Sequence, residues 1–145
     1  MTTPRTLQDL AKDMASIDFS MLMTHTDGGQ IAGRPMSNNG DVDYDGDSYF
    51  FAWDDARTVA DIERDAQVTL AMQGKPGIFG KPPLMLAIEG QAEIVRDRGA
   101  FAAHWQEELD RWFKQGPETP GLVMIKVHAT RIHYWDGEDE GELTL

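Results

Sequence analysis

The chain has 145 residues, a length that favours one domain with a core of its own. Its 13 Lys and Arg stand against 25 Asp and Glu, and the formal net charge of -12 excludes the clustered basic surface that binds nucleic acids or anionic membranes. The lack of cysteine in the sequence excludes disulfides, thiolate zinc sites and cysteine nucleophiles.

A short helix and a β-hairpin are predicted for the N-terminal part of the chain. Apolar residues recur at helical spacing over 7–14, which indicates an amphipathic helix. Two segments with strand character follow at 19–26 and 31–37, and the polar run DGGQ at 27–30 predicts a turn between them. The second segment contains Pro35, which has no N–H to donate, so we expect it where regular strand pairing ends.

The middle of the chain predicts a second hairpin, a helix, a strand and a loop, in that order. The segment 42–53 has Asp45 and Gly46 at its centre, a pair favoured in tight hairpin turns. Apolar residues on one side of 58–65 indicate a two-turn helix, and 66–73 returns to strand character. Glycine and proline dominate 74–83, which predicts a loop.

The C-terminal part predicts two long strands with a helix between them. The segment 84–95 reads as a strand bent at Gly90. An apolar stripe with acidic residues opposite it predicts a helix from about Asp97 to Lys114. The segment 122–137 reads as the last strand, and the acidic tail 138–145 is expected to be solvated or loosely ordered.

These elements predict a mainly β protein. Six or seven strands are joined mostly by hairpins, with short helices between some of them, and closing such a sheet removes its exposed edges. We therefore expect an antiparallel β-barrel with peripheral helices, formed by a single domain over 1–145. The N-terminus lacks the apolar segment of a signal peptide, and no apolar run is long enough to span a membrane, so we expect a cytoplasmic protein.

Sequence patterns for several other chemistries are incomplete. The segment 41–52 begins like a calcium loop, but Ala52 stands where such a loop needs a bidentate glutamate. The loop 74–83 lacks the glycine spacing and the hydroxyl of a P-loop, and no G-x-S-x-G motif is present. No metal site is expected, because metal-ligand spacing is missing around the histidines, His25, His104, His128 and His133.

Three segments together resemble one family. GRPMS at 33–37, YFFAWDDARTVADIERDAQVTLAM at 49–72 and TRIHYWDG at 130–137 are similar, in this order, to the FMN-binding split barrels. These are the pyridoxamine 5'-phosphate oxidase-like proteins, and the similarity is to their bacterial general stress protein group. The resemblance implies an antiparallel split barrel and a homodimer with a flavin at the interface, which is FMN or, as the alternative, FAD.

The resemblance also implies a set of cofactor-binding residues drawn from all three segments. They are Arg34, Pro35 and Met36 along the flavin and its phosphate, Phe51, Ala52 and Trp53 beside the ring or the ribityl chain, Arg57 and Thr58 at the phosphate, and Trp135 at the ring, from the same subunit or the other.

The chemistry of a phosphate agrees with this placement. A phosphate carries roughly two negative charges and favours a guanidinium group and the free N–H groups of a helix start. Arg57 and Thr58 stand where the predicted helix begins. Thr58 replaces a lysine that is usual in the family, and Asp54 and Asp55 would repel a phosphate unless one caps the helix and both point outward.

The C-terminus separates this chain from the pyridoxamine phosphate oxidases. These enzymes continue into a basic Arg-x-His-x-Arg stretch that binds the substrate's phosphate, whereas here the equivalent segment, 138–145, is acidic. Oxidation of pyridoxamine phosphate is therefore not expected. We expect a flavin-binding general stress protein, and flavin-dependent oxidoreductase activity is one hypothesis for its function. The alternatives are a non-enzymatic flavin-binding or sensing module and a split barrel that uses a deazaflavin or haem.

Overall fold

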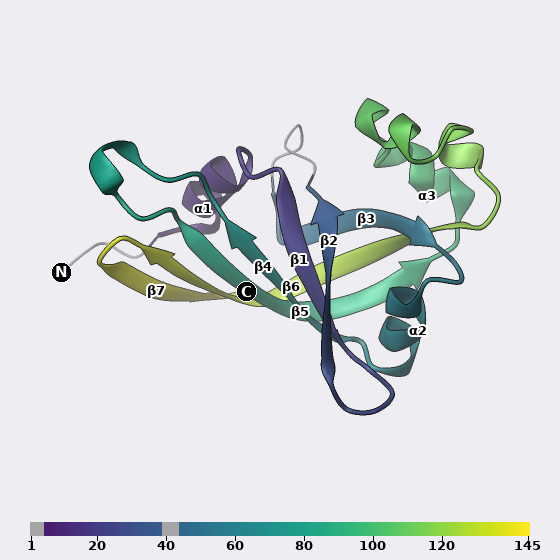
Figure 1. Ribbon diagram of the computed structural model, residues 1–145, viewed down its shortest axis with the longest axis horizontal. Coiled ribbons are helices and arrows are strands. Elements are labelled where there is room, and N and C mark those ends of the chain that lie inside the picture. The colour runs from purple at the N-terminus through teal and green to yellow at the C-terminus, as the bar shows by residue number, and fades with distance from the viewer. Residues whose placement is uncertain (1–4, 39–43) are drawn as a thin grey trace.

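The computed structural model describes residues 5–38 and 44–145, which form an antiparallel sheet with a few short helices around it (Figure 1). The seven strands are β1 (Phe19–His25), β2 (Ile31–Ser37), β3 (Asp47–Trp53), β4 (Gln67–Gln73), β5 (Met85–Val95), β6 (Leu122–Asp136) and β7 (Asp139–Thr144). The helices are α1 (Leu7–Met14), α2 (Arg57–Arg64) and α3 (Arg98–Ala103), with 3₁₀ turns η1 (Ile78–Gly80), η2 (Glu107–Arg111) and η3 (Gly116–Glu118). The mainly β, antiparallel fold class is confirmed.

The sheet is curled into a half-barrel with the strand order β2-β1-β4-β5-β6-β3. The long strand β6 pairs with β5 along its length, with β3 in its first half and with β7 in its second half. β2 pairs only with β1, so it is an edge strand, where the missing N–H of Pro35 is tolerated.

The main core lies on the inner face of the sheet. Leu22, Leu70, Ile88 and Ile132 stand opposite one another on four neighbouring strands, and each is 0% exposed. Alternation along each strand puts these side chains on one face, and burial of each contributes about 1.5 to 3 kcal/mol. This row sets the register of the strands, because a shift by one residue would turn it toward solvent.

Two helices cover this core near opposite ends of the sheet (Figure 1). α1 packs Leu10 and Met14 into it, and α2 packs Val59 and Ile62. Both helices have the boundaries that their apolar spacing predicts, to within about one residue.

A second apolar cluster lies on the opposite face of β3 and β6. Phe101, Leu109 and Phe113, from the segment between β5 and β6, pack there against Leu122 and Met124 of β6. β1 and β2 therefore pack against one apolar cluster, whereas β3 lies between two apolar clusters.

The continuous helix predicted from Asp97 to Lys114 is wrong. α3 ends at Ala103, His104 leaves the helical conformation, and the chain resumes as η2. The break lets Leu109 and Phe113 fold back onto the sheet, whereas the Trp112 side chain is 66% exposed.

The structure describes only the second half of the hairpin predicted at 42–53. β3 begins at Asp47 and pairs with β6 along its whole length. Asp45 and Gly46 form a bend before it, in which the Asp45 carboxylate accepts the Asp47 N–H at 3.0 Å and Gly46 has a φ of +108°. Residues 41–43 of the predicted hairpin and of the calcium-like pattern lie outside the described residues.

The acidic tail is a strand, not a loosely ordered segment. β7 pairs with β6 from Arg131 to Asp136, and its glutamates face basic side chains of β6: Glu140 lies 2.7 Å from His133, and Glu142 lies 3.5 Å from Arg131. The backbone ladder and these cross-strand pairs offset the repulsion between the acidic side chains.

The bend predicted at Gly90 is confirmed. The register of β5 and β6 shifts between Glu89 and Gly90, and a Cβ at Gly90 would collide with the carbonyl oxygen of His128. Glycine is therefore required where β5 crosses closely over β6.

Candidate functional site

Arg34 lies on β2, the strand at one edge of the sheet. It stands opposite Leu22, so its side chain belongs to the same face as the buried row, but the edge position leaves it exposed. Among the described residues, no carboxylate forms an ion pair with Arg34 or with Arg57. Both guanidinium groups are thus available to an anion from outside the chain.

The two residues after Arg34 have different surroundings. Pro35 stands opposite Met21 on the outer face, whereas Met36 is 6% exposed and packs in the main core. Met36 therefore offers a ligand its backbone rather than its side chain.

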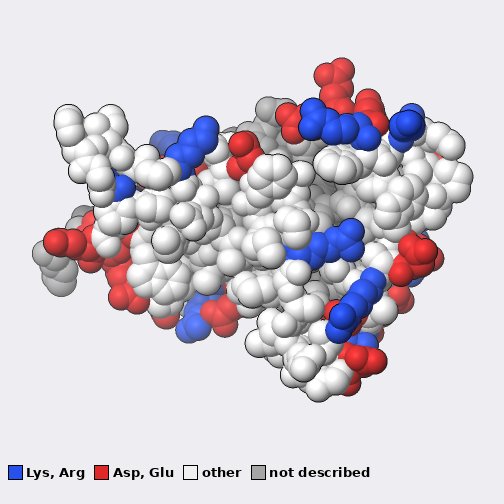
Figure 2. All heavy atoms as spheres, viewed as in Figure 1, with Lys and Arg blue, Asp and Glu red and all other residues white. Residues whose placement is uncertain are grey.

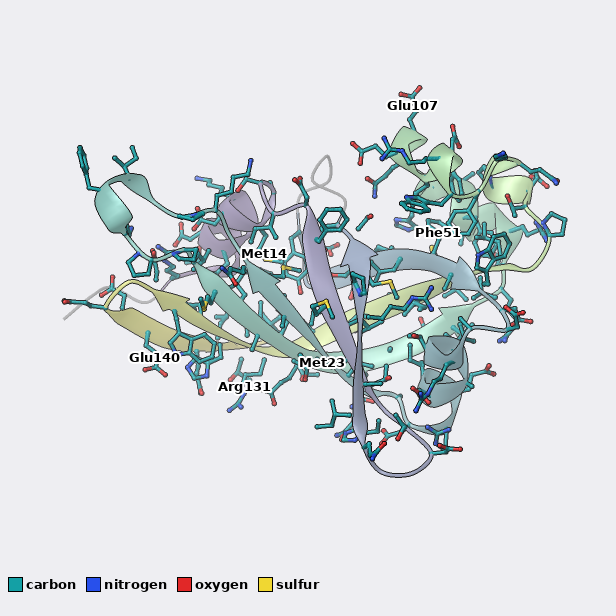
Figure 3. The ribbon with its side chains drawn as sticks, in the orientation of Figure 1. Met14, Met23, Phe51, Glu107, Arg131 and Glu140 are labelled. Carbon is teal, nitrogen blue, oxygen red and sulfur yellow. The ribbon has the colours of Figure 1, made fainter. Side chains whose placement is uncertain are left out.

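The predicted site residues of β3 are divided between the two faces of that strand. Ala52 points into the main core, while Phe51 and Trp53 point to the other face, where Phe51 lies 4.9 Å from Trp105 and Trp53 lies 5.0 Å from Phe113, between ring centroids. Figure 3 shows Phe51 on the side of β3 that faces α3. The structure thus does not bring the ring of Phe51 together with Arg34.

The first turn of α2 carries the features of an anion site. Its N-cap residue is Ala56, no side chain caps it, and its first turn contains no acidic residue. The Val59 N–H donates to the Ala56 carbonyl at 3.1 Å, whereas the first two N–H groups of a helix have no acceptor inside it, and the helix dipole favours a negative charge there. Arg57 is exposed beside this turn, and Thr58 is 7% exposed.

A buried polar contact fixes α2 against the sheet. The Thr24 hydroxyl on β1 donates to Asp61 Oδ2 at 2.9 Å, and Arg64 donates to Asp61 Oδ1 at 2.9 Å and to the His25 carbonyl at 2.8 Å. Thr24 follows Leu22, the partner of Arg34, by two residues, which is about 7 Å along a strand. Arg34 and α2 therefore lie on the same face of β1, near the same end.

The outer face of the sheet carries an apolar groove with a volume of about 720 Å³. Phe19 and Met85 line it and are 64% and 42% exposed, and Pro82 and Pro83 of the β4–β5 loop form one end. None of the predicted elements or motifs indicated this groove. A signal was present in FSMLMTH at 19–25, because both faces of that strand carry large apolar side chains.

Trp135 lies in this groove and is 38% exposed. Its ring stacks on His133 at 4.0 Å between centroids, and His133 contacts Glu140 at 2.7 Å. Trp135 stands opposite Met85 on the outer face, whereas Arg34 belongs to the inner face. One copy of the chain thus separates Trp135, predicted at the flavin ring, from Arg34, predicted at the phosphate.

A smaller cavity of about 150 Å³ lies between α1 and the start of β3. The rings of Tyr49 and His104 stack there at 3.6 Å between centroids, and burial raises the pKa of the Tyr49 hydroxyl. None of the predicted site residues lines it.

The fold and the site together define a small open β-barrel with an exposed arginine on its edge strand and an apolar outer groove. The chain belongs to the pyridoxamine 5'-phosphate oxidase-like family, whose sequence model matches residues 5–145. The resemblance inferred from the three segments is therefore confirmed.

Solved structures share this fold at low sequence identity. General Stress Protein 26 from Bacillus anthracis has 23% identity and a TM-score of 0.72, with 92% of this chain and 96% of that chain covered. The general stress FMN/FAD binding protein from Xanthomonas citri has 23% identity and a TM-score of 0.73, covering 92% and 89%. A heme binding protein from Mycobacterium smegmatis has 18% identity and a TM-score of 0.76, covering 99% of this chain and 60% of that chain.

No curated protein sequence matches the chain. Within residues 5–38 and 44–145, no helix is long and apolar enough to cross a membrane, and no group of three or more His, Asp or Glu side chains could hold a metal ion.

Proposed function

We propose that the chain is a flavin-binding general stress protein that holds FMN at the interface of a homodimer. The observation that carries this proposal is the uncapped first turn of α2, which begins with Arg57, an exposed arginine without a carboxylate partner among the described residues. The Xanthomonas citri protein, which binds FMN or FAD according to its name, supports the choice of a flavin.

The phosphate of FMN fits the inner edge of the sheet. Arg34 comes from β2 and Arg57 from α2, and the first-turn N–H groups of α2 add donors without charge. Thr58 replaces the usual family lysine, so Arg57 supplies the second positive charge in this chain.

The flavin ring fits the outer groove of a second copy. Trp135, Met21 and Met85 offer a flat aromatic face and apolar side chains to a planar ring. Because Trp135 and Arg34 lie on opposite faces of one copy, a homodimer brings the groove of one copy toward the phosphate edge of the other. Figure 2 shows uncharged side chains gathered over β1, β4 and the neighbouring part of β5, with most charged side chains around the margin.

The chemistry would come from the flavin, which accepts and donates a hydride when bound. The residues of this chain hold the phosphate, orient the ring and exclude water from it. No side chain is assigned as a general acid or base. Turnover as an oxidoreductase and flavin binding without turnover are both consistent with such a site, and reduction of the bound flavin by nicotinamides distinguishes them.

Pyridoxamine phosphate is a poor substrate for this site. The segment that is basic in the oxidases is here the strand β7, whose Glu140 and Glu142 lie beside Trp135 and His133. A phosphorylated substrate would meet these carboxylates rather than arginines.

Haem is the second candidate cofactor, because the Mycobacterium smegmatis protein is named for binding it. The chromophore distinguishes the candidates. We expect the purified protein, or the protein after addition of FMN, to show the flavin absorption bands and to release FMN on denaturation. A protein that binds neither FMN nor FAD would contradict the proposal, and a Soret band would establish haem instead.

A further inference from the structure

Asp54 lies next to the proposed phosphate site and carries the wrong charge for it. It follows β3 directly and precedes the N-cap of α2 by two residues. Neither Asp54 nor Asp55 caps the helix, because the cap is Ala56 without a side-chain hydrogen bond. The helix dipole places a partial positive charge at the start of a helix, and a carboxylate this close to it competes with a bound phosphate for that charge.

Arg96 binds this carboxylate from another part of the chain. Its Nη2 donates to Asp54 Oδ1 at 2.7 Å and to Glu63 Oε1, near the C-terminal end of α2, at 3.3 Å. Arg96 follows the last residue of β5, so its backbone is held by the sheet. The hydrogen bonds to Asp54 and Glu63 raise the pKa of Arg96, whose guanidinium is charged at neutral pH in any case.

The helix is thus held from two sides. Asp61 fixes its inner side to Thr24 of β1, and Arg96 links Asp54, ahead of its first turn, with Glu63 on its last turn. Neither contact involves Arg57, which is exposed at the first turn.

We propose that Arg96 is a positioning residue for the phosphate of the flavin: it holds Asp54 in an ion pair and so keeps a negative charge away from the first turn of α2. The inference rests on the proposed function. It explains how the chain keeps an anion site although Asp54 and Asp55 precede α2 and Thr58 stands where the family usually has a lysine.

The test compares FMN with riboflavin, which has the same ring and no phosphate. Both are titrated into the purified apoprotein at low ionic strength, where exposed charges are least screened. For Arg96→Ala we expect FMN to bind roughly threefold to tenfold more weakly, because Asp54 then acts on the phosphate. The affinity for riboflavin is expected to change less than about twofold.

Two further variants separate this role from general damage. Arg96→Ala combined with Asp54→Asn removes the freed charge and should restore the FMN affinity. Arg98→Ala is the matched control, because it removes the same charge two residues further along the chain. The Arg98 side chain donates to the backbone carbonyls of Pro117 and Thr119 and has no carboxylate partner among the described residues. This variant should leave both affinities unchanged.

Each outcome is decisive. Unchanged FMN binding by Arg96→Ala would overturn the inference, and so would an equal loss for FMN and riboflavin that Asp54→Asn does not restore. A wild-type protein that binds neither flavin would overturn the proposed function and this inference with it.

Discussion

The arginines of this chain differ in what surrounds them. Arg34 and Arg57 have no carboxylate partner in the part of the chain that the structure describes, although the sequence contains 25 acidic residues. An exposed guanidinium that is left free in such a chain is suited to an external anion. Four other arginines bind a carboxylate at 2.7 to 2.9 Å: Arg5, Arg64, Arg96 and Arg131.

Arg34→Ala should weaken FMN binding by about 1.5 to 3 kcal/mol, the range of a charge-assisted hydrogen bond. Titration of the apoprotein with FMN, followed by flavin fluorescence, measures this loss. Arg111→Ala serves as the control. It removes an exposed arginine on η2, an element that contains none of the predicted site residues. Unchanged FMN affinity in Arg34→Ala would move the phosphate contact to Arg57.

Thr24→Val should lower the free energy of unfolding by about 1 to 3 kcal/mol, because it leaves the buried Asp61 carboxylate without one of its two side-chain partners. Urea denaturation measures the change. Thr69→Val is the matched control on the outer face of β4, and its effect should stay within about 0.5 kcal/mol. Equal stability of the two variants would show that the Thr24 contact does not hold α2.

At the scale of elements, α1 is fixed by a capping box. Thr6 Oγ1 accepts the Asp9 N–H at 3.2 Å, and the Asp9 carboxylate accepts the Thr6 N–H at 3.0 Å. The helix so defined packs Leu10, which is 0% exposed, into the core. The hydrogen bond that the Thr6 N–H donates to the Asp9 carboxylate lowers the pKa of Asp9 below its ordinary value of 3.8.

This shift gives a pH dependence with a definite sign. A carboxyl group whose pKa is lowered in the folded state stabilises the fold above its unfolded pKa, and this contribution is lost as the pH falls through the folded value. Asp9→Asn should therefore be less stable than the wild type at pH 7, and the difference should shrink below about pH 4. Thermal unfolding at several pH values measures it, with the exposed Asp18→Asn as control. A difference that stays constant down to pH 3 would contradict the assignment.

Elements with local signals could be predicted from the sequence, and those that depend on distant partners could not. α1, α2 and the Gly90 bend follow from apolar spacing and from a glycine. β7 is an acidic segment with little strand propensity, and it is a strand because β6 supplies His133 and Arg131 opposite its glutamates. Its pairing is a property of the sheet, which the local pattern does not contain.

The candidate site divides in the same way. Arg34 and the start of α2 were predicted from ordered sequence segments. The structure places Arg34 on the face of β1 on which Thr24 contacts Asp61, in the middle of α2. The ion pair of Arg96 with Asp54 joins residues 42 positions apart, and the outer groove combines residues of β1, β4, β5 and β6 with the β4–β5 loop. Such contacts arise only when the topology is known.

At the scale of the whole molecule, one face of the sheet remains apolar. Phe19, Met21, Met85 and Trp135 are each at least 38% exposed in or beside the groove, in a chain whose formal net charge is -12. Contiguous apolar area of this kind marks an interaction site. A second copy that covers it would bring the groove and the phosphate edge together.

Met85→Glu should therefore convert a dimer to monomers and weaken FMN binding at the same time. A charge buried in an apolar interface without a partner is costly, and the ring would lose the Trp135 of the second copy. Sedimentation velocity and FMN titration of the same sample measure both effects. Trp112→Glu, at a side chain that is 66% exposed but remote from the groove, introduces the same charge and should leave the dimer and the affinity intact. A wild-type monomer that binds FMN tightly, or a Met85→Glu dimer with full affinity, would show that the flavin is held by one copy alone.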